Sequence, residues 1–560
     1  AAASMAAATA TDGQGVRRRT GSRALVAWPH ARCCRSRRFA PRRSGAPALA
    51  SARHGEERPT KGPAASAAAQ RAQHSEQAAV PSAGLGMVQP GTHQKKFTTV
   101  YKFGGTSVAD AARMAEVANI VCLFQEEAPV VVLSAMGKTT NNLIRAGEQA
   151  LHCSSNEVRG LEPLEKIFQL HRETVEALKL PDDTKKEVED LLHELQQLLV
   201  GVSLLKDLTP RSLDSLVSFG ERLSTRIFAG YLRANGIKSV QHDAFELGVT
   251  TTDNFTDGDL LYELSSSQVN KNLGRFDEQG HPVLPVVTGF LGRGMSTGAI
   301  TTLGRGGSDL TSTFLGAALG MDEVIVWKDV DGVLTTDPRV CPEAKPIPLL
   351  TVAEATELAY FGATVLHPQS MMPLFECKQD LNVRVRNSYN PSAPGSIICK
   401  ERDMSSSLLS SIVLKSGVTL VDIVSRRMLG QYGFLSKVFR VFEELEISVD
   451  VVATSEVSVS VTLDPSKIWS RDLGDDELRM LKQSFGNLAK VDLQKGRSII
   501  SLIGNAERSC EILETTFCVL RGLDVNPEMI SKGAYKNNIA MIVPEKDGHR
   551  CIQALHQRFF

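Results

Sequence analysis

The stretch YKFGGTSVA combines a lysine, two glycines and two hydroxyl side chains, a set of residues that suits the binding of an anion. Gly104 and Gly105 let backbone N–H groups approach phosphate oxygens with no Cβ in the way. Thr106 and Ser107 can donate hydrogen bonds or cap a following helix, whose N-terminus favours an anion. Lys102 would bring a mobile positive charge to the oxygens of a phosphoryl group in transfer. The alternative is a plain strand-to-helix turn, and this stretch alone does not decide between the two.

A second glycine-rich loop, LGRGGSD, carries opposite charges on either side of its glycine pair. Arg305 can hold a carboxylate with two parallel hydrogen bonds, while Gly306 and Gly307 leave room for a ligand. Asp309 can orient the lysine of the first loop or accept a hydrogen bond from it. The loop therefore suits a small substrate that bears a carboxylate.

Two further charged segments are compatible with a ligand site, although each is a weak signal by itself. FGERLS places Glu221 and Arg222 at the predicted start of a helix, where such a pair is more often a surface salt bridge. The segment 327–339, WKDVDGVLTTDPR, follows a predicted strand and either wraps a nucleotide or forms a structured turn. Several such loops after buried strands favour ligand binding, because open α/β sheets bind ligands outside the carboxyl ends of their strands.

Two common nucleotide-binding motifs are excluded, each because one required glycine is replaced by another residue. SAMGKTTNN contains GKTT, but a P-loop needs a glycine five residues before Gly137, and Val132 stands there. In LGRGGSD, Asp309 stands where the dinucleotide motif G-x-G-x-x-G needs its last glycine. The sequence therefore predicts neither a P-loop enzyme nor hydride transfer.

The loops that carry these residues connect the predicted strands and helices of an α/β domain. Residues 109–124 have helical spacing, and the strand before them and the apolar run 128–135 after them complete a strand–helix–strand unit. Continuous apolar strands are also predicted at 281–290, 322–330 and 381–387. Such continuous apolar runs indicate a mainly parallel sheet covered on both faces.

Composition marks a helical lobe within this domain and a linker at its end. Residues 157–210 are strongly charged with helical spacing, which predicts a solvated helical lobe. Residues 390–407 are rich in Pro, Gly and Ser and indicate a linker, placed at about 401–410. The catalytic domain is therefore predicted at 97–400.

After the linker, a strand–helix–strand–strand–helix–strand order occurs twice. The first unit is predicted at 411–494 and the second at 495–560, each the size of a ferredoxin-like α+β module. Neither unit contains an obvious cluster of catalytic side chains. The two units are therefore either oligomerisation modules or ligand-sensing domains.

The equal numbers of basic and acidic residues, 63 of each, hide a strong segregation of charge. Residues 1–50 hold ten Arg and a single acid in an Ala- and Ser-rich background. This composition is typical of an organelle transit peptide, and a basic tail that contacts nucleic acid is the alternative. Residues 1–90 hold 14 basic and 4 acidic residues, which leaves 49 basic against 59 acidic residues in the body. That acidic body is not expected to bind nucleic acid.

The cysteines and the apolar runs exclude several other classes of protein. Ten cysteines are scattered without a CxxC motif or regular spacing, so neither a disulfide framework nor a zinc site is predicted. No apolar run reaches the 18 residues that a membrane-spanning helix needs. The expected environment is therefore a reducing, aqueous one.

Six motifs of the chain, in order, resemble those of the aspartate kinases of the amino acid kinase family: KFGGTSV, VVLSAMGKTTN, SFGERLS, TTLGRGGSD, DVDGVLTTDPR and FGATVLHP. The resemblance covers about 97–560, and the two C-terminal units resemble ACT domains. It implies a three-layer α/β sandwich with a mainly parallel sheet, followed by two ferredoxin-like ACT domains. With the transit-type composition of 1–90, the chain resembles the monofunctional aspartate kinases of plant chloroplasts, which implies a location in the stroma.

The resemblance implies that ATP, with Mg²⁺, phosphorylates L-aspartate to 4-phospho-L-aspartate, the first step toward lysine, threonine and methionine. Because the acceptor carboxylate is already ionised, no general base is required, and positioning and electrostatics do most of the catalysis. The implied catalytic residues are Lys102 and Asp309, and no protein ligand to a metal is implied. The implied ATP-side residues are Lys102, Gly104, Gly105, Thr106, Ser107, Ser134, Ser308, Lys328, Asp329, Asp331 and Arg339. The implied aspartate-side residues are Thr140, Glu221, Phe290, Arg305 and Ser308.

The resemblance of the C-terminal units to ACT domains implies regulation by lysine. The implied effector site is lined by Met428, Gln431, Gly433, Phe434, Leu435, Asp450, Ser455 and Glu456. The strand near 410–415 is expected to join the second ACT unit, and ACT units are expected to pair in a homodimer. S-adenosylmethionine, to which some plant relatives respond, is a second candidate effector. The chain departs from some bacterial members at Thr364 and Leu334, which replace a lysine and an aromatic residue of the family's nucleotide side.

Three alternative functions share parts of this pattern. Another amino acid kinase would act on glutamate or on a nucleoside monophosphate, but such enzymes typically lack paired ACT domains. A kinase fused to homoserine dehydrogenase is not expected, since no dinucleotide motif follows the second ACT unit. A non-catalytic ACT-type sensor is disfavoured by the presence of Lys102, Glu221, Arg305 and Asp309.

Overall fold

The computed structural model describes most of the chain from residue 97 onward. The described residues are 97–124, 127–276, 279–362, 366–376, 380–405, 407–425, 432–445, 447–455, 457–463, 475–486, 488–533 and 537–560. The predicted transit segment at 1–90 lies outside them, as do Thr364 and the predicted effector residues Met428, Gln431 and Glu456. No helix within these ranges is both long and apolar enough to cross a membrane.

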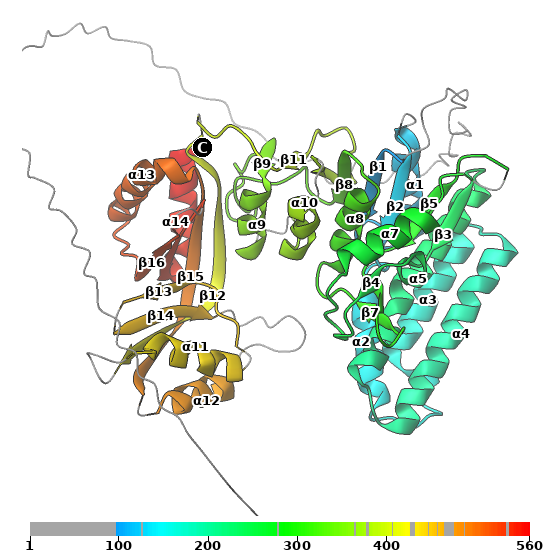
Figure 1. Cartoon of the computed structure of the whole chain (residues 1–560), viewed down its shortest axis with the longest axis horizontal. Helices are drawn as coiled ribbons and strands as arrows, with labels where there is room; N and C mark the ends of the chain where they lie inside the picture. Colours follow the sequence, from blue (N-terminus) through cyan, green and yellow to red (C-terminus); the bar gives the residue numbers. More distant parts are fainter. Residues whose placement is uncertain are drawn as a thin grey trace, which may run out of the picture. The chain divides into compact units, whose positions relative to one another are not determined.

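In the described part of the chain, eight strands form one sheet in the order β3-β5-β2-β1-β8-β10-β11-β9 (Figure 1). Neighbouring strands are parallel except β10 and β11, which are antiparallel. The predicted, mainly parallel sheet is therefore confirmed. Its strands are β1 (Thr99–Phe103), β2 (Pro129–Leu133), β3 (Ser239–His242), β5 (Leu284–Thr288), β8 (Glu323–Lys328), β9 (Leu349–Thr351), β10 (Asn382–Asn387) and β11 (Ser396–Cys399). A smaller sheet contains β4 (Thr250–Thr251), β6 (Leu291–Gly294) and β7 (Ile300–Thr302).

Alternate residues of the central strands face two separate hydrophobic cores, which gives the domain its three layers. Tyr101 and Phe103 of β1 lie in one core, and Val100 lies in the other. The first core is shared with α1 (Ala111–Leu123), α2 (Thr139–Ala150), α3 (Glu162–Ala177), α4 (Asp182–Leu205) and α5 (Pro210–Ala234). The second core is shared with α6 (Ala244–Leu247), α7 (Tyr262–Asn272), α8 (Gly307–Ala318), α9 (Val352–Tyr360) and α10 (Met372–Glu376).

Two helices begin at positions that differ from the sequence-based expectation. The side chain of Asp110 caps α1 by accepting a hydrogen bond from the backbone N–H of Arg113, so neither hydroxyl of the GGTS turn is the cap. Helix α5 begins at Pro210 after the N-cap Thr209, which favours an early helix start. Glu221 therefore lies in the middle of α5, and its predicted place at the start of a helix was wrong.

Part of the segment predicted to be a linker is a strand of the main sheet. Ser396–Cys399 forms β11, which pairs with β10 on one side and β9 on the other. Ile398 of this strand is fully buried, so the short apolar run SIIC outweighs the surrounding Pro, Gly and Ser residues. The sheet therefore continues to Cys399, close to the predicted end of the catalytic domain.

The C-terminal region of the described chain contains a second large sheet, with six strands in the order β13-β14-β12-β15-β17-β16. The two predicted strands 410–415 and 497–504 are parts of much longer strands that run through both predicted ACT units. Both long strands contain a glycine with positive φ, Gly417 and Gly496, near the register shifts between them. The strands are β12 (Leu409–Ser425), β13 (Val452–Thr454), β14 (Ser458–Leu463), β15 (Ala489–Gly504), β16 (Met529–Lys532) and β17 (Asn538–Pro544), and the helices are α11 (Phe434–Glu444), α12 (Asp475–Phe485), α13 (Ser509–Gly522) and α14 (Glu545–Phe559).

The long strands weave the two ACT units together. The first half of β12 pairs with the second half of β15, which in turn pairs with β17. The second half of β12 pairs with β14 and with the first half of β15. The expectation that the strand near 410–415 joins the second unit is thus confirmed, because this strand supplies the edge that the second unit lacks.

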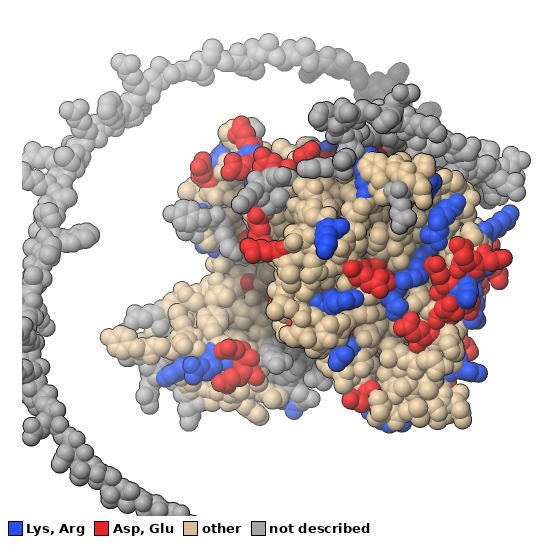
Figure 2. Space-filling view, turned by 45° about the vertical axis from the view of Figure 1, so that its right-hand side comes forward, with Lys and Arg blue, Asp and Glu red and all other residues tan. Residues whose placement is uncertain are grey.

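Charged contacts on the described surface mix both signs. On the face in Figure 2, Lys and Arg side chains lie beside Asp and Glu side chains rather than in a patch of one sign. Examples on the helical lobe are the pairs Arg172–Glu189 and Lys166–Glu162. Surface pairs of this kind contribute little to stability, and a mixed face of this kind does not favour binding to a polyanion.

Candidate active site

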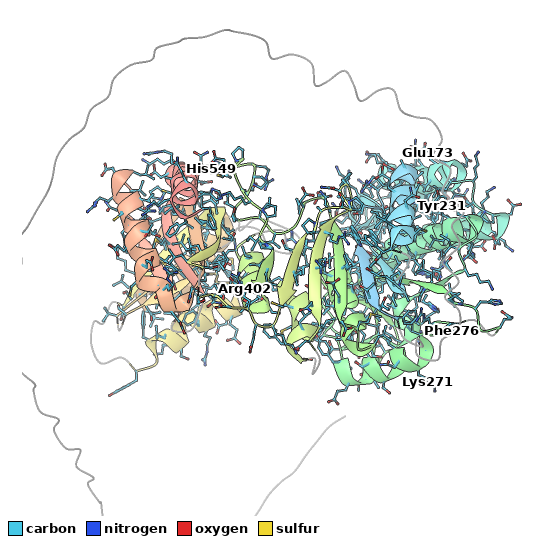
Figure 3. The ribbon with its side chains drawn as sticks, turned by 90° about the horizontal axis from the view of Figure 1, so that it is seen from above. Glu173, Tyr231, Lys271, Phe276, Arg402 and His549 are labelled. Atoms are coloured by element: carbon cyan, nitrogen blue, oxygen red, sulfur yellow. The ribbon has the colours of Figure 1, made fainter. Side chains whose placement is uncertain are left out.

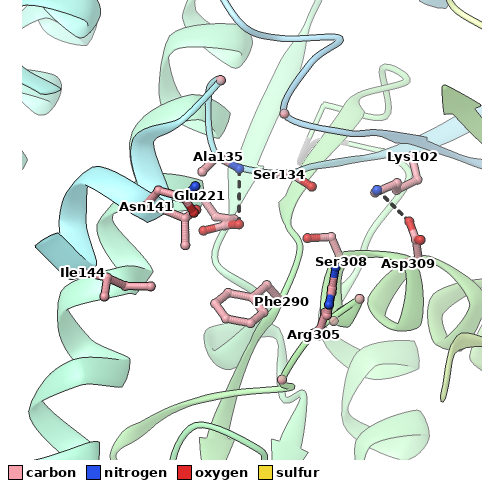
Figure 4. A pocket seen from close by; sticks show the side chains of 16 residues that line it. Lys102, Ser134, Ala135, Asn141, Ile144, Glu221, Phe290, Arg305, Ser308 and Asp309 are labelled. Atoms are coloured by element: carbon pink, nitrogen blue, oxygen red, sulfur yellow. Dashed lines mark hydrogen bonds and ion pairs between the residues drawn. The ribbon is translucent and has the colours of Figure 1, made fainter. Parts of the chain in front are cut away.

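An ion pair joins the end of β1 to the first turn of α8. Lys102 Nζ lies 2.6 Å from Asp309 Oδ1, and the two side chains are only 10% and 9% exposed (Figure 4). Strand alternation directs Lys102 away from the core of Tyr101 and Phe103, toward the sheet face that α8 covers. Burial alone would raise the pKa of the Asp309 carboxyl, but the charges of Lys102 and Lys328 outweigh burial, so the pKa is lowered. Asp309 is therefore ionised and holds the lysine in place.

Two glycines form the N-terminus of α8, next to the Lys102–Asp309 ion pair. Gly306 is the N-cap of α8 with φ +78°, and a Cβ there would lie 2.1 Å from the Cβ of His367. Gly307 has no room for a Cβ either, because one would lie 2.8 Å from the ring of Phe290. The backbone N–H groups of this helix end, with the helix dipole, favour an anion.

The turns after β1 and β2 are in contact through Gly105. A Cβ on Gly105 would lie 2.7 Å from the carbonyl oxygen of Ala135, and Gly137 donates a backbone hydrogen bond of 3.0 Å to the Gly105 carbonyl. Gly105 is therefore required for the close approach of the two turns, in addition to leaving its backbone open to a ligand. Lys102 and Ser134 meet at the same edge of the sheet for this reason.

A buried carboxylate from α5 reaches the turn after β2. Glu221 Oε1 accepts a hydrogen bond of 3.2 Å from the backbone N–H of Ala135, and Oε2 has no hydrogen-bond partner among the described residues. A Cβ on Gly220 would lie 2.7 Å from the Cβ of Ala135, so glycine permits this close helix packing. Burial raises the pKa of Glu221 to about 8, against the lowering effects of the Ala135 hydrogen bond and the Lys102 charge. An unpaired, buried carboxyl of this kind suits a cationic group of a ligand.

The backbone of Phe290 is strained at the cavity wall. Its φ of +70° is unusual for a residue with a side chain, and two backbone hydrogen bonds hold it there. Phe290 N donates to Thr311 Oγ1 at 3.1 Å, and its carbonyl accepts from Leu303 N at 2.9 Å. Such strain is found where the surrounding structure fixes a side chain for a function.

These groups line one cavity of about 610 Å³ (Figure 4). The cavity brings together nine of the predicted site residues: Lys102, Gly105, Ser134, Thr140, Glu221, Phe290, Arg305, Ser308 and Asp309. The ion pair and the carboxyl of Glu221 lie at opposite sides of it, with Arg305 and Ser308 between them in the view of Figure 4. A single ligand space therefore has a cationic, an anionic and a helix-terminus contact.

The other predicted nucleotide residues lie outside this cavity lining, which does not include Gly104, Thr106, Ser107, Lys328, Asp329, Asp331 or Arg339. Ser107 is buried, and its hydroxyl lies 3.2 Å from that of Ser388. Asp331 accepts hydrogen bonds from the side chains of Asn387 and Asn390. Arg339 is 88% exposed and is paired with Asp337 at 2.7 Å. These residues belong to the loops at the carboxyl ends of β1, β8 and β10.

Sequence reasoning missed several residues of the cavity and of its surroundings. The missed lining residues are Ala135, Gly137, Asn141, Ile144 and Gly304, whereas Gly306 and Gly307, which were expected to leave room for a ligand, do line the cavity. Asn141 lies within the quoted AMGKTTN motif, so the motif itself was the available signal. Ser388 and Arg113, which are joined by a hydrogen bond of 2.9 Å behind the first glycine loop, gave no signal because 275 residues separate them.

The described residues of the predicted effector site lie at the start of α11 and on either side of β13. Gly433 is the N-cap of α11 with φ +78°, Phe434 is buried, and Leu435 is 41% exposed. Asp450 Oδ2 lies 2.7 Å from Lys415 Nζ, a lysine on β12. The Ser455 hydroxyl lies 2.7 Å from that of Ser458. Asp450, which was predicted to line the effector site, is thus paired with an ammonium group of the chain itself.

Known proteins match this chain in both of its regions. The amino acid kinase family matches residues 97–387, and an ACT domain family matches residues 500–559. Aspartokinase 1, chloroplastic, of Arabidopsis thaliana is 57% identical over 83% of this chain and 81% of its own length. Lysine-sensitive aspartokinase 3 of Escherichia coli is 36% identical over 82% of this chain and 99% of its own length.

Solved structures give the same result for the fold. E. coli aspartokinase III in complex with aspartate and ADP, in the R-state, has a TM-score of 0.69 at 34% identity, covering 83% of this chain and 100% of that one. The same enzyme in complex with lysine and aspartate, in the T-state, has a TM-score of 0.67 at 33% identity, covering 83% and 99%. The chain therefore belongs to the amino acid kinase family, and within it to the aspartokinases.

Proposed function

We propose that this protein is an aspartate kinase, which transfers the γ-phosphoryl group of ATP to the side-chain carboxylate of L-aspartate. The observation that carries the proposal is the composition of the 610 Å³ cavity, whose lining includes Lys102, Asp309, Glu221 and Arg305. One end offers a positive charge and a helix N-terminus, and the other offers a buried carboxyl with an unused oxygen. A zwitterionic amino acid and a phosphate chain together complement these groups.

The aspartate would lie between Glu221 and Arg305. The ammonium group of the substrate pairs with the unused oxygen of Glu221, and Arg305 holds its α-carboxylate through two N–H groups. Thr140 and Phe290 shape the space between the two charged groups. This arrangement fixes the amino acid by its two constant groups and directs its side-chain carboxylate toward Lys102.

The phosphoryl group would pass across the ion pair. Lys102 stabilises the negative charge on the transferring oxygens, while Asp309 orients the lysine, and Gly105, Ser134 and Ser308 offer hydrogen-bond donors around it. The substrate carboxylate attacks in line, the bond between the γ-phosphorus and the bridging oxygen breaks, and ADP leaves with that oxygen. No base is needed because the nucleophile carries no proton.

The nucleotide would extend from the cavity over the loops after β1, β8 and β10. Gly104, Thr106 and Ser107 lie on the first loop, and Lys328, Asp329, Asp331 and Arg339 lie on the second or at its start. No cluster of three metal-ligating side chains occurs in the described residues. Mg²⁺ takes most of its ligands from phosphates and water and few from the protein, so it would be held mainly by the nucleotide.

Regulation, assembly and location follow as further parts of this proposal. Lysine would bind around the start of α11. The existence of a lysine complex of the E. coli relative supports lysine as the effector. S-adenosylmethionine is a second candidate effector, and a homodimer through the ACT units is the expected assembly. The basic, acid-poor residues 1–90 and the chloroplastic relatives support import into the chloroplast, where the stroma would be the site of action.

A coupled assay of ADP release tests the function directly. The full chain is incubated with ATP, Mg²⁺ and L-aspartate, with L-glutamate and N-acetyl-L-aspartate as alternative acceptors, and the acyl phosphate is trapped with hydroxylamine. The proposal expects turnover with aspartate, and little with the N-acetyl compound because it lacks the ammonium group that Glu221 holds. Equal turnover with aspartate and N-acetyl-aspartate would contradict the proposed role of Glu221, and ADP release that does not depend on aspartate would contradict the function.

A further inference from the structure

The loop after β8 is held at its base by its own short backbone ladder. The Val333 carbonyl accepts a hydrogen bond of 2.7 Å from Ile347 N, and Thr335 N donates a second backbone bond of 2.9 Å to the Lys345 carbonyl. The loop leaves the sheet at Lys328, whose charge acts on Asp309 of the catalytic cavity. A change in the loop's position would therefore reach both the nucleotide side and the cavity.

Helix α14 contacts the far part of this loop through one buried imidazole. His556, which is 2% exposed, has its Nε2 2.9 Å from Thr335 Oγ1 and its Nδ1 3.3 Å from Cys341 Sγ. Gln553, one turn earlier on α14, donates a hydrogen bond of 2.9 Å to the Val340 carbonyl. Both ring nitrogens of His556 thus make hydrogen bonds, and their partners Thr335 and Cys341 lie six residues apart in the loop.

Thr335 is the point where three parts of the chain meet. Its carbonyl accepts from Ile412 N at 2.8 Å and from Ser411 Oγ at 2.9 Å, both on β12. Its hydroxyl contacts His556 and also accepts from Lys345 N at 3.0 Å. Every polar atom of Thr335 is therefore committed, and β12 and α14 hold it from two directions.

The contact at Cys341 fixes the turn that carries Arg339. Val340 and Cys341 both donate backbone hydrogen bonds to the Asp337 carbonyl, and the Asp337 carboxylate holds Arg339. The turn 337–341 is otherwise on the surface, because Arg339 is 88% exposed. Without the α14 contacts, the turn would rely on its local hydrogen bonds alone.

We propose that His556 is a positioning residue for the nucleotide, which acts through Thr335 and Cys341 by fixing the loop between β8 and β9. A neutral imidazole matches this position because it offers one donor and one acceptor, and both partners are hydroxyl or thiol groups that can take either role. The inference rests on the proposed function, which places the nucleotide over this loop. It assigns to the C-terminal helix of the ACT region an indirect part in nucleotide affinity, through the position of this loop.

Three replacements of His556 in the full chain separate this role from a merely structural one. His556→Ala removes both contacts, His556→Gln places an amide where Nε2 was, and His556→Asn places one where Nδ1 was. We expect His556→Ala to raise KM for ATP and the dissociation constant of ADP about tenfold while KM for aspartate stays within about twofold, because only the nucleotide contacts the loop. We expect His556→Gln to recover most of the ADP affinity, since it restores the bond to Thr335.

Two further variants keep the test decisive if His556→Ala does not fold. Thr335→Val keeps the shape of the residue and removes the hydroxyl, and it should give the same selective loss. The double variant that combines Thr335→Val with His556→Ala should bind ADP no more weakly than the weaker-binding single variant. This is expected because the two residues are partners in one contact. Gln557→Ala, an exposed neighbour on α14, is the matched control and should behave like the wild type.

Three results would each overturn the inference. They are an equal rise in KM for ATP and for aspartate in His556→Ala, unchanged ADP binding in that variant, and the same dissociation constant of ADP for His556→Ala and His556→Gln. ADP binding is measured by calorimetry without an acceptor. An absence of aspartate-dependent turnover in the wild type would therefore contradict the proposed function without deciding the role of His556.

Discussion

Lys102 Nζ and Asp309 Oδ1 lie 2.6 Å apart, although 207 positions separate the two residues along the chain. The contact joins a strand end to a helix N-terminus, two elements that lie on the same edge of the sheet. Both side chains are almost buried, so their attraction is little screened by water. The pair places a fixed positive charge beside the N-terminus of α8.

Replacing Lys102 with Ala is expected to abolish catalysis while the fold is kept. Loss of a charge that stabilises the transferring phosphoryl group should lower kcat by at least about 100-fold. The measurement is aspartate-dependent ADP release, together with circular dichroism to establish that the protein is folded. Lys271→Ala, on the exposed end of α7, should retain normal turnover. Near-normal turnover of Lys102→Ala would show that the ion pair is structural.

Glu221→Gln is expected to stabilise the free protein as the pH rises, while it weakens aspartate binding. The pKa of Glu221 is raised to about 8, so between about pH 4.5 and 8 the folded protein holds a proton that the unfolded chain has lost. Folding therefore becomes less favourable as the pH rises through this window, and the Gln variant escapes that cost. The melting temperature of the variant should exceed that of the wild type more at pH 8.5 than at pH 5.

The same variant should raise KM for aspartate, because the amide, unlike the carboxyl, cannot lose a proton and pair as an anion with the ammonium group. Glu187→Gln on the exposed face of α4 provides the control for a surface carboxyl. A gain in melting temperature that is equal at both pH values would argue against a raised pKa at Glu221.

His171 in the helical lobe should make the protein sensitive to acid. Burial lowers the pKa of His171 to about 4, although its Nδ1 lies 2.7 Å from the Ile167 carbonyl, a contact that opposes the shift. The stabilisation from a neutral His171 is present above about pH 6.5 and is lost as the pH falls toward 4, because the unfolded chain takes up the proton first. The loss amounts to about 3 kcal/mol at most.

Urea unfolding at pH 7 and pH 4.5 measures this effect. His171→Leu should show a smaller drop in the free energy of unfolding between the two pH values than the wild type. His193→Leu, an exposed histidine on α4, should follow the wild type. Identical drops for the wild type and His171→Leu would mean that other groups dominate the acid response.

The pair Lys415–Asp450 is expected to set the sensitivity to lysine. Its atoms lie 2.7 Å apart with side chains 16% and 8% exposed, so the ammonium of an effector must compete with that of Lys415. Lys415→Met should lower the half-inhibitory lysine concentration about tenfold, because the competing cation is gone. Asp450→Ala should weaken inhibition, since it removes the carboxylate that both cations use.

Inhibition curves of the full chain with lysine distinguish the two outcomes. Lys490→Met, an exposed lysine on β15, is the control. If Lys415→Met weakens inhibition as Asp450→Ala does, the pair serves to hold the site together and does not compete with the effector.

Another ion pair illustrates how a distant partner can remain hidden in the sequence. Arg402, labelled in Figure 3, pairs with Glu354 at 2.6 Å and donates a hydrogen bond of 2.7 Å to Ser410. Glu354 is also the third residue of α9 and forms the capping box with the N-cap Thr351. The local capping box could be predicted from the sequence, whereas the ion pair depends on how the chain folds back.

The sequence by itself determined the elements and the chemistry of the loops. Apolar runs such as that of β2 and β8 predict buried parallel strands, because their side chains face a core on both sides. The glycines and charges of KFGGTSV and LGRGGSD predict a site for an anion and a carboxylate, and the cavity contains Lys102, Arg305 and Asp309 together. Local residue types were sufficient for these conclusions because backbone freedom and charge are local properties.

Only the tertiary structure decided which distant residues meet. The length of α5 and the missing Cβ of Gly220 bring Glu221 to Ala135, and burial there raises the pKa of its carboxyl. The long strands β12 and β15 join the two ACT units, and α14 brings His556 to Thr335 across 221 positions of sequence. Such contacts depend on packing and burial, which are properties of the whole fold and leave no local pattern in the sequence.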